Sequence, residues 1–275
     1  MFWEAGAFMS LVDTHIHVFV RGLPLAPVRR YVPEYDATYE DYLRHAQHSG
    51  VTHAVIVQPS FLGTDNSYMC GVLRQHRQAL RGIAVVDPSI SEDGLDALQA
   101  DGVVGIRLNL DGLPIPTLDQ GPWPALLASL KRRRWQVEVH RVGRDLPAFV
   151  PALLEAGVDV VLDHFGRPDD DLGADDPAFR ALLGWGASRH LWVKLSGAYR
   201  NGSEGRGFAN APAQTRLLLE HLGADRLVWG SDWPHTRHES VISVERMCQC
   251  LEDWVPSRAQ REAIMGQTAL ELFRF

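Results

Sequence analysis

The sequence predicts an α/β protein formed by a single (β/α)8 barrel, and three observations support this fold class. Short β-branched runs alternate with longer helical stretches along most of the chain, which is typical of β-α units around a parallel sheet. Eight such units within 275 residues fit the usual size of a closed barrel. The fingerprints G-x-G-x-x-G and G-x-x-x-x-G-K-[ST], which an open nucleotide-binding sheet would carry, are absent from the sequence.

The predicted strands are rich in valine, isoleucine and leucine, and several of them end in polar residues. They cover residues 11–17, 53–58, 82–86, 103–108, 135–140, 159–164, 191–196 and 227–232. Between them, helices are predicted at residues 39–49, 123–133, 146–156 and 213–222. Gly50, Gly157 and Gly223 follow three of these helices and are suited to end them in a left-handed conformation.

One domain is expected over residues 10–275, preceded by an N-terminal extension of residues 1–9. The extension lacks the basic and apolar regions of a signal peptide, and no apolar run approaches the ~20 residues of a membrane span. The three cysteines form an odd, sparse set, which indicates reduced thiols rather than disulfides. We therefore expect a cytoplasmic protein without a membrane partner. Its oligomeric state stays open, because no segment marks an interface.

The charge balance narrows the class of partner. A net charge of −7 and an isoelectric point near 5.9 argue against nucleic-acid binding, which requires a basic face. A small anionic ligand remains compatible with an acidic chain, because a few arginines in a pocket can reverse the local potential.

His15 and His17 are the most informative pair of residues in the sequence. Side chains alternate between the two faces of a strand, so residues two apart share a face. Both imidazoles are therefore expected to point into the barrel at its C-terminal mouth, with Asp13 deeper on the same face. One metal ion or one substrate could then contact both rings.

Three further residues are predicted to meet this pair. His140 ends the fifth predicted strand, His164 the sixth and Asp232 the eighth. In a (β/α)8 barrel the C-terminal strand ends share one face, where active sites lie. The joint pattern therefore indicates a functional site. By residue type, His15, His17, His140 and Asp232 could hold one Zn²⁺ or Mn²⁺.

Several motifs resemble one known family. They are Asp-Thr-His-Ile-His at 13–17, Asp-His-Phe-Gly at 163–166, Lys-Leu-Ser-Gly at 194–197, Trp-Gly-Ser-Asp-Trp-Pro-His at 229–235 and the final helix at 266–273. Together they resemble the amidohydrolase superfamily, in particular its amidohydrolase 2 group, and within it the 2-pyrone-4,6-dicarboxylate hydrolases and related lactonases. The resemblance spans nearly the whole chain.

The resemblance implies a distorted TIM barrel of the metallo-dependent-hydrolase type, with His15, His17, His164 and Asp232 as catalytic residues. Family members with two metals use a lysine or glutamate at the fourth strand, where this sequence has Arg107, so a two-metal site is not expected. The pyrone dicarboxylate hydrolases are understood to work without a metal. The expectation therefore leans towards no required cofactor, with a single Zn or Mn ion left open.

A lactone-opening mechanism assigns a role to each of these groups. Asp232 would act as general base towards water, and His15, His17 and His164 would stabilise the oxyanion. A small anionic lactone needs cations, for which Arg107 and Arg200 are the first candidates and Arg141 the third. Further substrate-binding candidates, and residues expected at the border of the site, are Ser60, Tyr199, Asn66, Trp233 and His235, whereas His238 is expected outside it.

The sequence thus predicts a hydrolase that opens a small acidic lactone, with 2-pyrone-4,6-dicarboxylate as the leading substrate. A sugar-acid lactonase is the near alternative, and a zinc-dependent decarboxylase of an aromatic acid is the second. A barrel that binds a small acid without catalysis is a third possibility. The complete set of histidines and aspartate argues against it.

Overall fold

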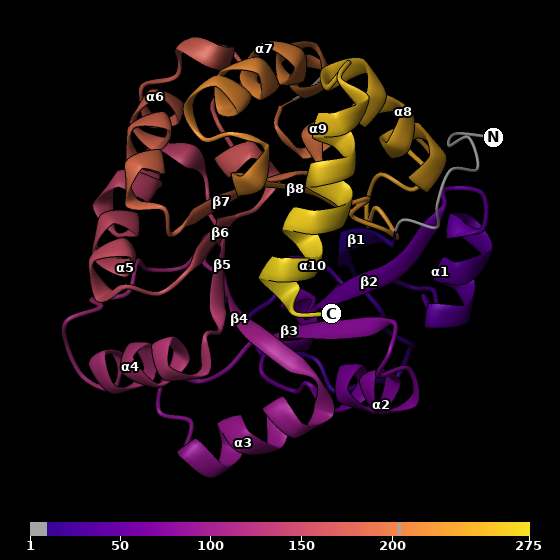
Figure 1. The fold of residues 1–275 in the computed structure, drawn as a ribbon. Coiled ribbons are helices and arrows are strands. Elements are labelled where there is room, and N and C mark those ends of the chain that lie inside the picture. The colour runs from indigo at the N-terminus through magenta and orange to yellow at the C-terminus, as the bar shows by residue number, and fades with distance from the viewer. Residues whose placement is uncertain (1–9, 203–204) are drawn as a thin grey trace.

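The computed structural model describes residues 10–202 and 205–275, so the predicted extension at residues 1–9 lies outside the described residues. Eight parallel strands follow one another around the sheet in sequence order, and helices surround them (Figure 1). The strands are β1 (Leu11–Ile16), β2 (Val51–Val57), β3 (Leu80–Ala84), β4 (Val103–Asn109), β5 (Gln136–His140), β6 (Val160–Leu162), β7 (Leu191–Leu195) and β8 (Leu227–Trp229). This arrangement confirms the predicted (β/α)8 barrel.

The helices lie outside the strands and include those predicted from the sequence. They are α1 (Tyr39–Ala46), α2 (Ser67–Gln75), α3 (Glu92–Asp101), α4 (Trp123–Arg133), α5 (Val150–Ala156), α6 (Pro177–Gly184), α7 (Arg206–His221), α8 (Val244–Trp254), α9 (Arg258–Glu262) and α10 (Thr268–Phe273). Among the described residues, none of these helices is long and apolar enough to cross a membrane.

The barrel closes where the segment after β8 meets β1. The backbone N–H of Asp232 donates to the carbonyl of His15 at 2.9 Å, and the N–H of His17 donates to the carbonyl of Trp233 at 2.8 Å. These bonds lie beyond the last residue of β8, so closure is made by a loop rather than by a long strand ladder. Closure therefore brings three expected site residues side by side.

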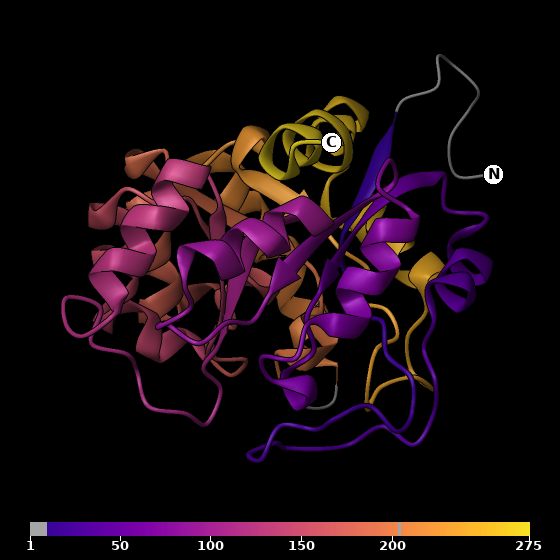
Figure 2. The same cartoon turned by 90° about the horizontal axis from the view of Figure 1, so that it is seen from below.

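The lower part of the barrel interior is apolar and is plugged by the C-terminal helix. Val12, Val104 and Val228 cluster there with Ala269 and Phe273 of α10. Figure 2 shows α10 at one end of the strands and the long loop between β1 and α1 at the other. One end of the barrel is thus sealed, and the open end is the one at which the strands finish.

Two predicted strands are too long at their C-terminal ends, where the chain turns towards the site. The sixth strand ends at Leu162 instead of residue 164, and the eighth at Trp229 instead of residue 232. His164 and Asp232 have φ values of 53° and 63°, which a regular strand cannot contain. Both side chains are therefore placed by turns, a conformation that strand periodicity does not reveal.

Two predicted helices also differ in extent. The stretch predicted at residues 146–156 is broken at Phe149, whose φ is −146°, into a 3-10 turn (Gly143–Ala148) and α5. Pro147 and Pro151 lie on either side of the break and restrict the backbone there. In contrast, α7 begins at Arg206, well before the predicted residue 213.

A β-bulge in β1 corrects the expected orientation of Asp13. Asp13 pairs with Ala54 and Ile16 pairs with Ile56, so three residues of β1 advance against two of β2. His15 consequently faces the barrel interior, whereas Asp13 faces outward and accepts a hydrogen bond from the Tyr42 hydroxyl of α1 at 3.1 Å. Asp13 supports the site from behind, because its carboxylate also accepts from the backbone N–H groups of His15 and Ser231.

We expect Asp13→Asn to alter how stability depends on pH. Burial raises the pKa of Asp13 from 3.8 to about 6, so the folded protein keeps a proton that the unfolded chain releases. The stability contributed by this proton is complete below the unfolded pKa and is lost as pH rises through the folded pKa. Relative to the wild type, the variant should gain roughly 2 kcal/mol between about pH 4.5 and pH 7.5. Urea unfolding at both pH values measures this, and a constant difference between the two proteins would contradict it.

Candidate active site

A cavity of about 270 Å³ lies at the open end of the barrel. Its wall contains most of the residues expected at the site, since the strand ends and the turns after them converge there. The expected residues that line it are His17, Ser60, Arg107, His140, His164, Tyr199, Arg200 and Asp232. These residues come from β4, β5 and the segments after β1, β2, β6, β7 and β8, as the barrel prediction requires.

Several expected residues stay outside the cavity wall, among them His15 and Asn66. His15 is fully buried beneath it. Asn66 uses its amide on backbone groups instead: its Nδ2 donates to the carbonyls of Thr64 and Val85, and its Oδ1 accepts from the N–H of Val85. Asn66 therefore ties the loop after β2 to the end of β3, and its expected contact with substrate is replaced by this structural role.

Asp232 has one carboxylate oxygen that is fully engaged and one that is free. Its Oδ2 accepts from the Tyr199 hydroxyl at 2.5 Å and from the Arg200 Nε. Its Oδ1 is buried without a hydrogen-bond partner among the described residues and lies 3.7 Å from Nε2 of both His15 and His17. Burial alone would raise the pKa of Asp232, but the Arg200 guanidinium holds it well below its usual range. The residue is therefore an ionised carboxylate with one oxygen available for a proton.

Three buried histidines of the site, His15, His140 and His164, are uncharged at neutral pH. Burial lowers the pKa of His164 to about 3, and it lowers the pKa values of His15 and His140 well below the ordinary range. The His17 Nδ1 lies 2.7 Å from the carbonyl oxygen of Val57. Because a carbonyl can only accept, Nδ1 of His17 carries the proton, and its Nε2 faces the site.

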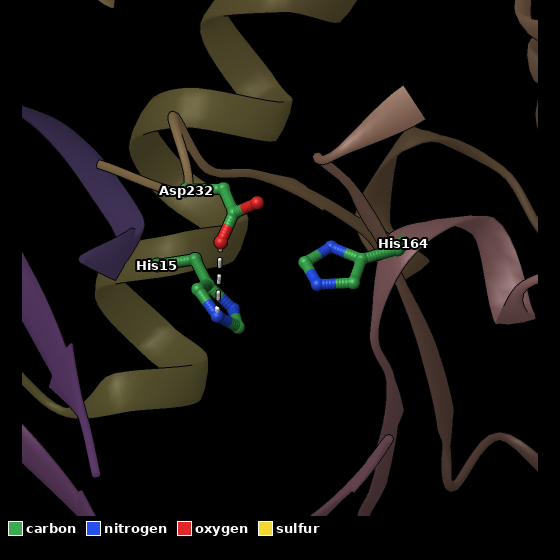
Figure 3. A group of neighbouring side chains, drawn as sticks. All are labelled: His15, His164 and Asp232. Carbon is green, nitrogen blue, oxygen red and sulfur yellow. Dashed lines mark ion pairs between the residues drawn. The ribbon is translucent and has the colours of Figure 1, made fainter. Parts of the chain in front are cut away.

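Three side chains have the donor types for a metal ion. Figure 3 shows His15 and Asp232 together on one side of the site, with His164 facing them from the other. Ligand atoms of these three residues lie within 4.8 Å of one another, and the His15 Nε2 and Asp232 Oδ1 are buried without partners. Two imidazoles and a carboxylate fit one Zn²⁺ or Mn²⁺ by donor type. This group shares only His15 and Asp232 with the set expected from the sequence.

His140 lies elsewhere in the cavity wall. Its ring centroid is 5.6 Å from that of His164, and it belongs to neither cluster of metal-type ligands found among the described residues. The difference arises because His140 ends a regular strand, whereas His164 is turned towards Asp232 by its left-handed backbone.

A layer of buried ion pairs underlies the cavity, and the sequence prediction did not include it. Arg107 donates from Nε and a terminal nitrogen to Asp163 Oδ2 at 2.9 and 2.8 Å. The Lys194 ammonium lies 2.7 Å from Glu138 Oε1 and 3.4 Å from Asp163 Oδ1. Burial alone would raise the pKa of Asp163, but Arg107 and Lys194 hold it well below its usual range. The signal in the sequence that could have revealed this layer is the presence of charged residues on the interior face of otherwise apolar strands.

The mouth of the cavity adds arginines and a histidine that come from loops. Arg30 and Arg167 both pair with Asp111, and Arg237 and His238 line the same wall. No strand pattern could have predicted them, because loop backbones place these side chains.

The segment after Asp232 also differs from expectation. His235 was expected at the border and His238 outside it, but His238 lines the cavity and His235 does not. Instead, His235 is buried, with its Nδ1 3.2 Å from the Tyr199 hydroxyl. Trp233, expected as a pocket wall, packs against Tyr42 with ring centroids 5.6 Å apart.

The sequence matches the amidohydrolase family over residues 12–275. A 2-pyrone-4,6-dicarboxylate hydrolase from Comamonas testosteroni is 30% identical over 235 residues, which cover 82% of this chain and 76% of that protein. A 4-sulfomuconolactone hydrolase from Hydrogenophaga intermedia is 27% identical over 267 residues, which cover 95% of this chain and 88% of that protein.

A solved structure shares the fold over the same extent. It is that of a probable 2-pyrone-4,6-dicarboxylic acid hydrolase from Acinetobacter baumannii with citric acid bound. It is 37% identical, with a TM-score of 0.90, and the match covers 97% of this chain and 100% of that chain. The similarity therefore includes the barrel and all of its strand ends.

Proposed function

Because this chain belongs to the amidohydrolase family, and because of the charge pattern of its cavity, we propose that it hydrolyses a small acidic lactone, with 2-pyrone-4,6-dicarboxylate as the leading substrate. One observation carries the proposal. A buried, ionised Asp232 presents a free oxygen beside uncharged imidazoles, inside a cavity whose wall carries several arginines. The relatives named above supply the substrate class.

Asp232 is suited to activate water. Its Oδ1 accepts a proton as the water oxygen bonds to the lactone carbonyl carbon. The Tyr199 hydroxyl and the Arg200 guanidinium hold Oδ2 and leave Oδ1 as the reacting oxygen. When the ring C–O bond then breaks, the proton on Oδ1 passes to the departing ring oxygen. The products are a hydroxyl or enol group and a ring-opened carboxylic acid, which releases its proton to solvent as a carboxylate, with one water consumed.

The oxygen of the lactone carbonyl needs donors as negative charge develops on it. His164 lines the cavity, and its Nδ1 lies 2.8 Å from the Ser196 hydroxyl, which fixes the plane of the ring. An uncharged imidazole can donate one N–H to the oxyanion in a site from which water is excluded. His15 lies below it, with ring centroids 5.1 Å apart.

The substrate carboxylates meet arginines on two sides. Arg107 is anchored by Asp163 and Arg200 by Asp232, so both guanidinium groups are held in place before the substrate enters. Arg237 adds a third cation at the mouth. Preorganised guanidinium groups bind carboxylates bidentately, which favours an acidic lactone over a neutral one.

A divalent ion held by His15, His164 and Asp232 would polarise the carbonyl and lower the pKa of a bound water. The steps above use only the side chains of this chain. Asp232 is already ionised through Arg200 and does not depend on an ion to accept a proton.

The proposal predicts turnover of 2-pyrone-4,6-dicarboxylate, followed as loss of its ultraviolet absorbance. We expect the rate to survive treatment with a strong chelator, because the side chains supply both the base and the oxyanion donors. Protein supplied with Zn²⁺ or Mn²⁺ is assayed in parallel. Turnover only with added ion would assign His15, His164 and Asp232 as its ligands.

Absence of turnover under all of these conditions would overturn the leading substrate. A panel of sugar-acid lactones and aromatic acids then distinguishes the alternatives: ring opening of a sugar lactone indicates the related lactonase, and release of CO2 from an aromatic acid indicates a decarboxylase.

A further inference from the structure

Lys194 occupies the centre of the ion-pair layer beneath the cavity. Its side chain is fully buried in the barrel interior. The ammonium nitrogen lies 2.7 Å from Glu138 Oε1, 3.0 Å from the carbonyl oxygen of Thr14 and 3.1 Å from Nδ1 of His15. Asp163 Oδ1 is a fourth neighbour at 3.4 Å. Two of these four neighbours are carboxyl groups, so Lys194 is the common ion-pair partner of Glu138 and Asp163.

The proton count of this group fixes the role of each neighbour. An ammonium has three N–H donors and no acceptor, and three acceptors lie within hydrogen-bond distance. Asp163 Oδ1 is left without a partner. Since Lys194 can only donate, the 3.1 Å contact is a hydrogen bond only when the Nδ1 of His15 offers a lone pair, which puts the proton of the uncharged ring on Nε2.

We infer that Lys194 is a positioning residue, which holds His15 as the Nε2–H tautomer and so directs an N–H towards the free oxygen of Asp232 on the cavity floor. The His15 Nε2 is buried without a partner and lies 3.7 Å from Asp232 Oδ1. Its relation to catalysis rests on the proposed function, in which that oxygen is the reacting one.

Asp163 offers His15 a second tautomer, with the proton on Nδ1, so the position of the ring proton depends on the neighbours of His15. Its Oδ1 lies 3.4 Å from Nδ1 of His15. Without the ammonium, Nδ1 would donate to this carboxylate, and Nε2 would present a lone pair to Asp232. A lone pair beside an ionised oxygen is repulsive, but it is what a metal ligand requires. Lys194 thus favours His15 as a donor over His15 as a ligand.

The tautomer is read directly by two-bond ¹H–¹⁵N correlation spectra of protein labelled at histidine nitrogens. Comparison with His15→Gln identifies the signals of His15. We expect Nε2 to carry the proton in the wild type and Nδ1 to carry it in Lys194→Met. In the same variant kcat for the lactone should fall by about 100-fold, as when one preorganised donor is lost, while KM changes little. Lys131→Met, at an exposed lysine, should change neither.

A protonated Nδ1 in the wild type, or an unchanged tautomer in Lys194→Met, would overturn the inference. If loss of the charge prevents folding, the double variant Lys194→Met/Glu138→Gln removes both members of the closest pair and should show the same switch. The tautomer is read without substrate, so absence of pyrone hydrolysis would count against the proposed function alone.

Discussion

Asp232→Asn is expected to reduce kcat for lactone opening on the order of 10³-fold, with the fold intact. Asparagine has the same shape and can still accept from Tyr199 and Arg200, the two partners of Oδ2. Its amide cannot take a proton from water, so general-base catalysis is lost. Single-turnover assays measure the loss in the chemical step, and calorimetric titration measures the affinity that remains.

Ligand affinity should be retained or strengthened in this variant, because a negative charge has been removed beside an anionic ligand. That result separates an enzyme from a barrel that only binds a small acid, since a binding protein has no chemistry to lose. Asp111→Asn is the matched control: this carboxylate lines the same cavity and pairs with Arg30 and Arg167. It should shift KM and leave kcat nearly unchanged. A kcat for Asp232→Asn within ten-fold of the wild type would remove Asp232 as the base.

The barrel and the convergence of its strand ends followed from the sequence because both depend on periodicity. The alternation of strands and helices implies a parallel sheet. His15 and His17 lie on the same side of the chain in the structure, as the two-residue period predicted. Asp13 lies on the opposite side, because a bulge adds one residue to β1 after Asp13. In this orientation Asp13 accepts a hydrogen bond from the backbone N–H of Ser231, a residue from the other end of the chain, which local periodicity cannot detect.

Residues held by turns and loops were the hardest to place. Asn66, Trp233 and His235 are polar or aromatic residues in loops after strands, and each is used for packing or for hydrogen bonds within the protein. Arg237 and His238 line the cavity from the loop after β8, and strand periodicity does not reveal where a loop places its side chains. Lys194, in contrast, was detectable, because it lies within the apolar strand β7 and a buried lysine in an apolar strand requires partners.

Arg107→Lys is expected to lower kcat/KM for a dicarboxylate lactone by about 100-fold, mostly through KM. The Arg107 guanidinium has enough donors to bind Asp163 with one edge, at 2.8 and 2.9 Å, while it lines the cavity with the other. A lysine ammonium is a point charge that cannot span both partners. It would remain with the buried Asp163, whose negative charge is costly to leave unpaired, and the substrate carboxylate would lose its contact.

The size of this effect should depend on the substrate. For a 2-pyrone that lacks the carboxylate held by Arg107, kcat/KM should fall little in the variant. The substitution in the protein and the change in the ligand are therefore coupled by about 2 to 3 kcal/mol. Arg141→Lys is the control, because Arg141 binds Asp145 and the carbonyl of Leu113 instead of lining the cavity. Equal losses for both substrates would mean that Arg107 acts through Asp163 and the buried ion pairs. A loss confined to the dicarboxylate would identify Arg107 as the residue that selects an acidic lactone.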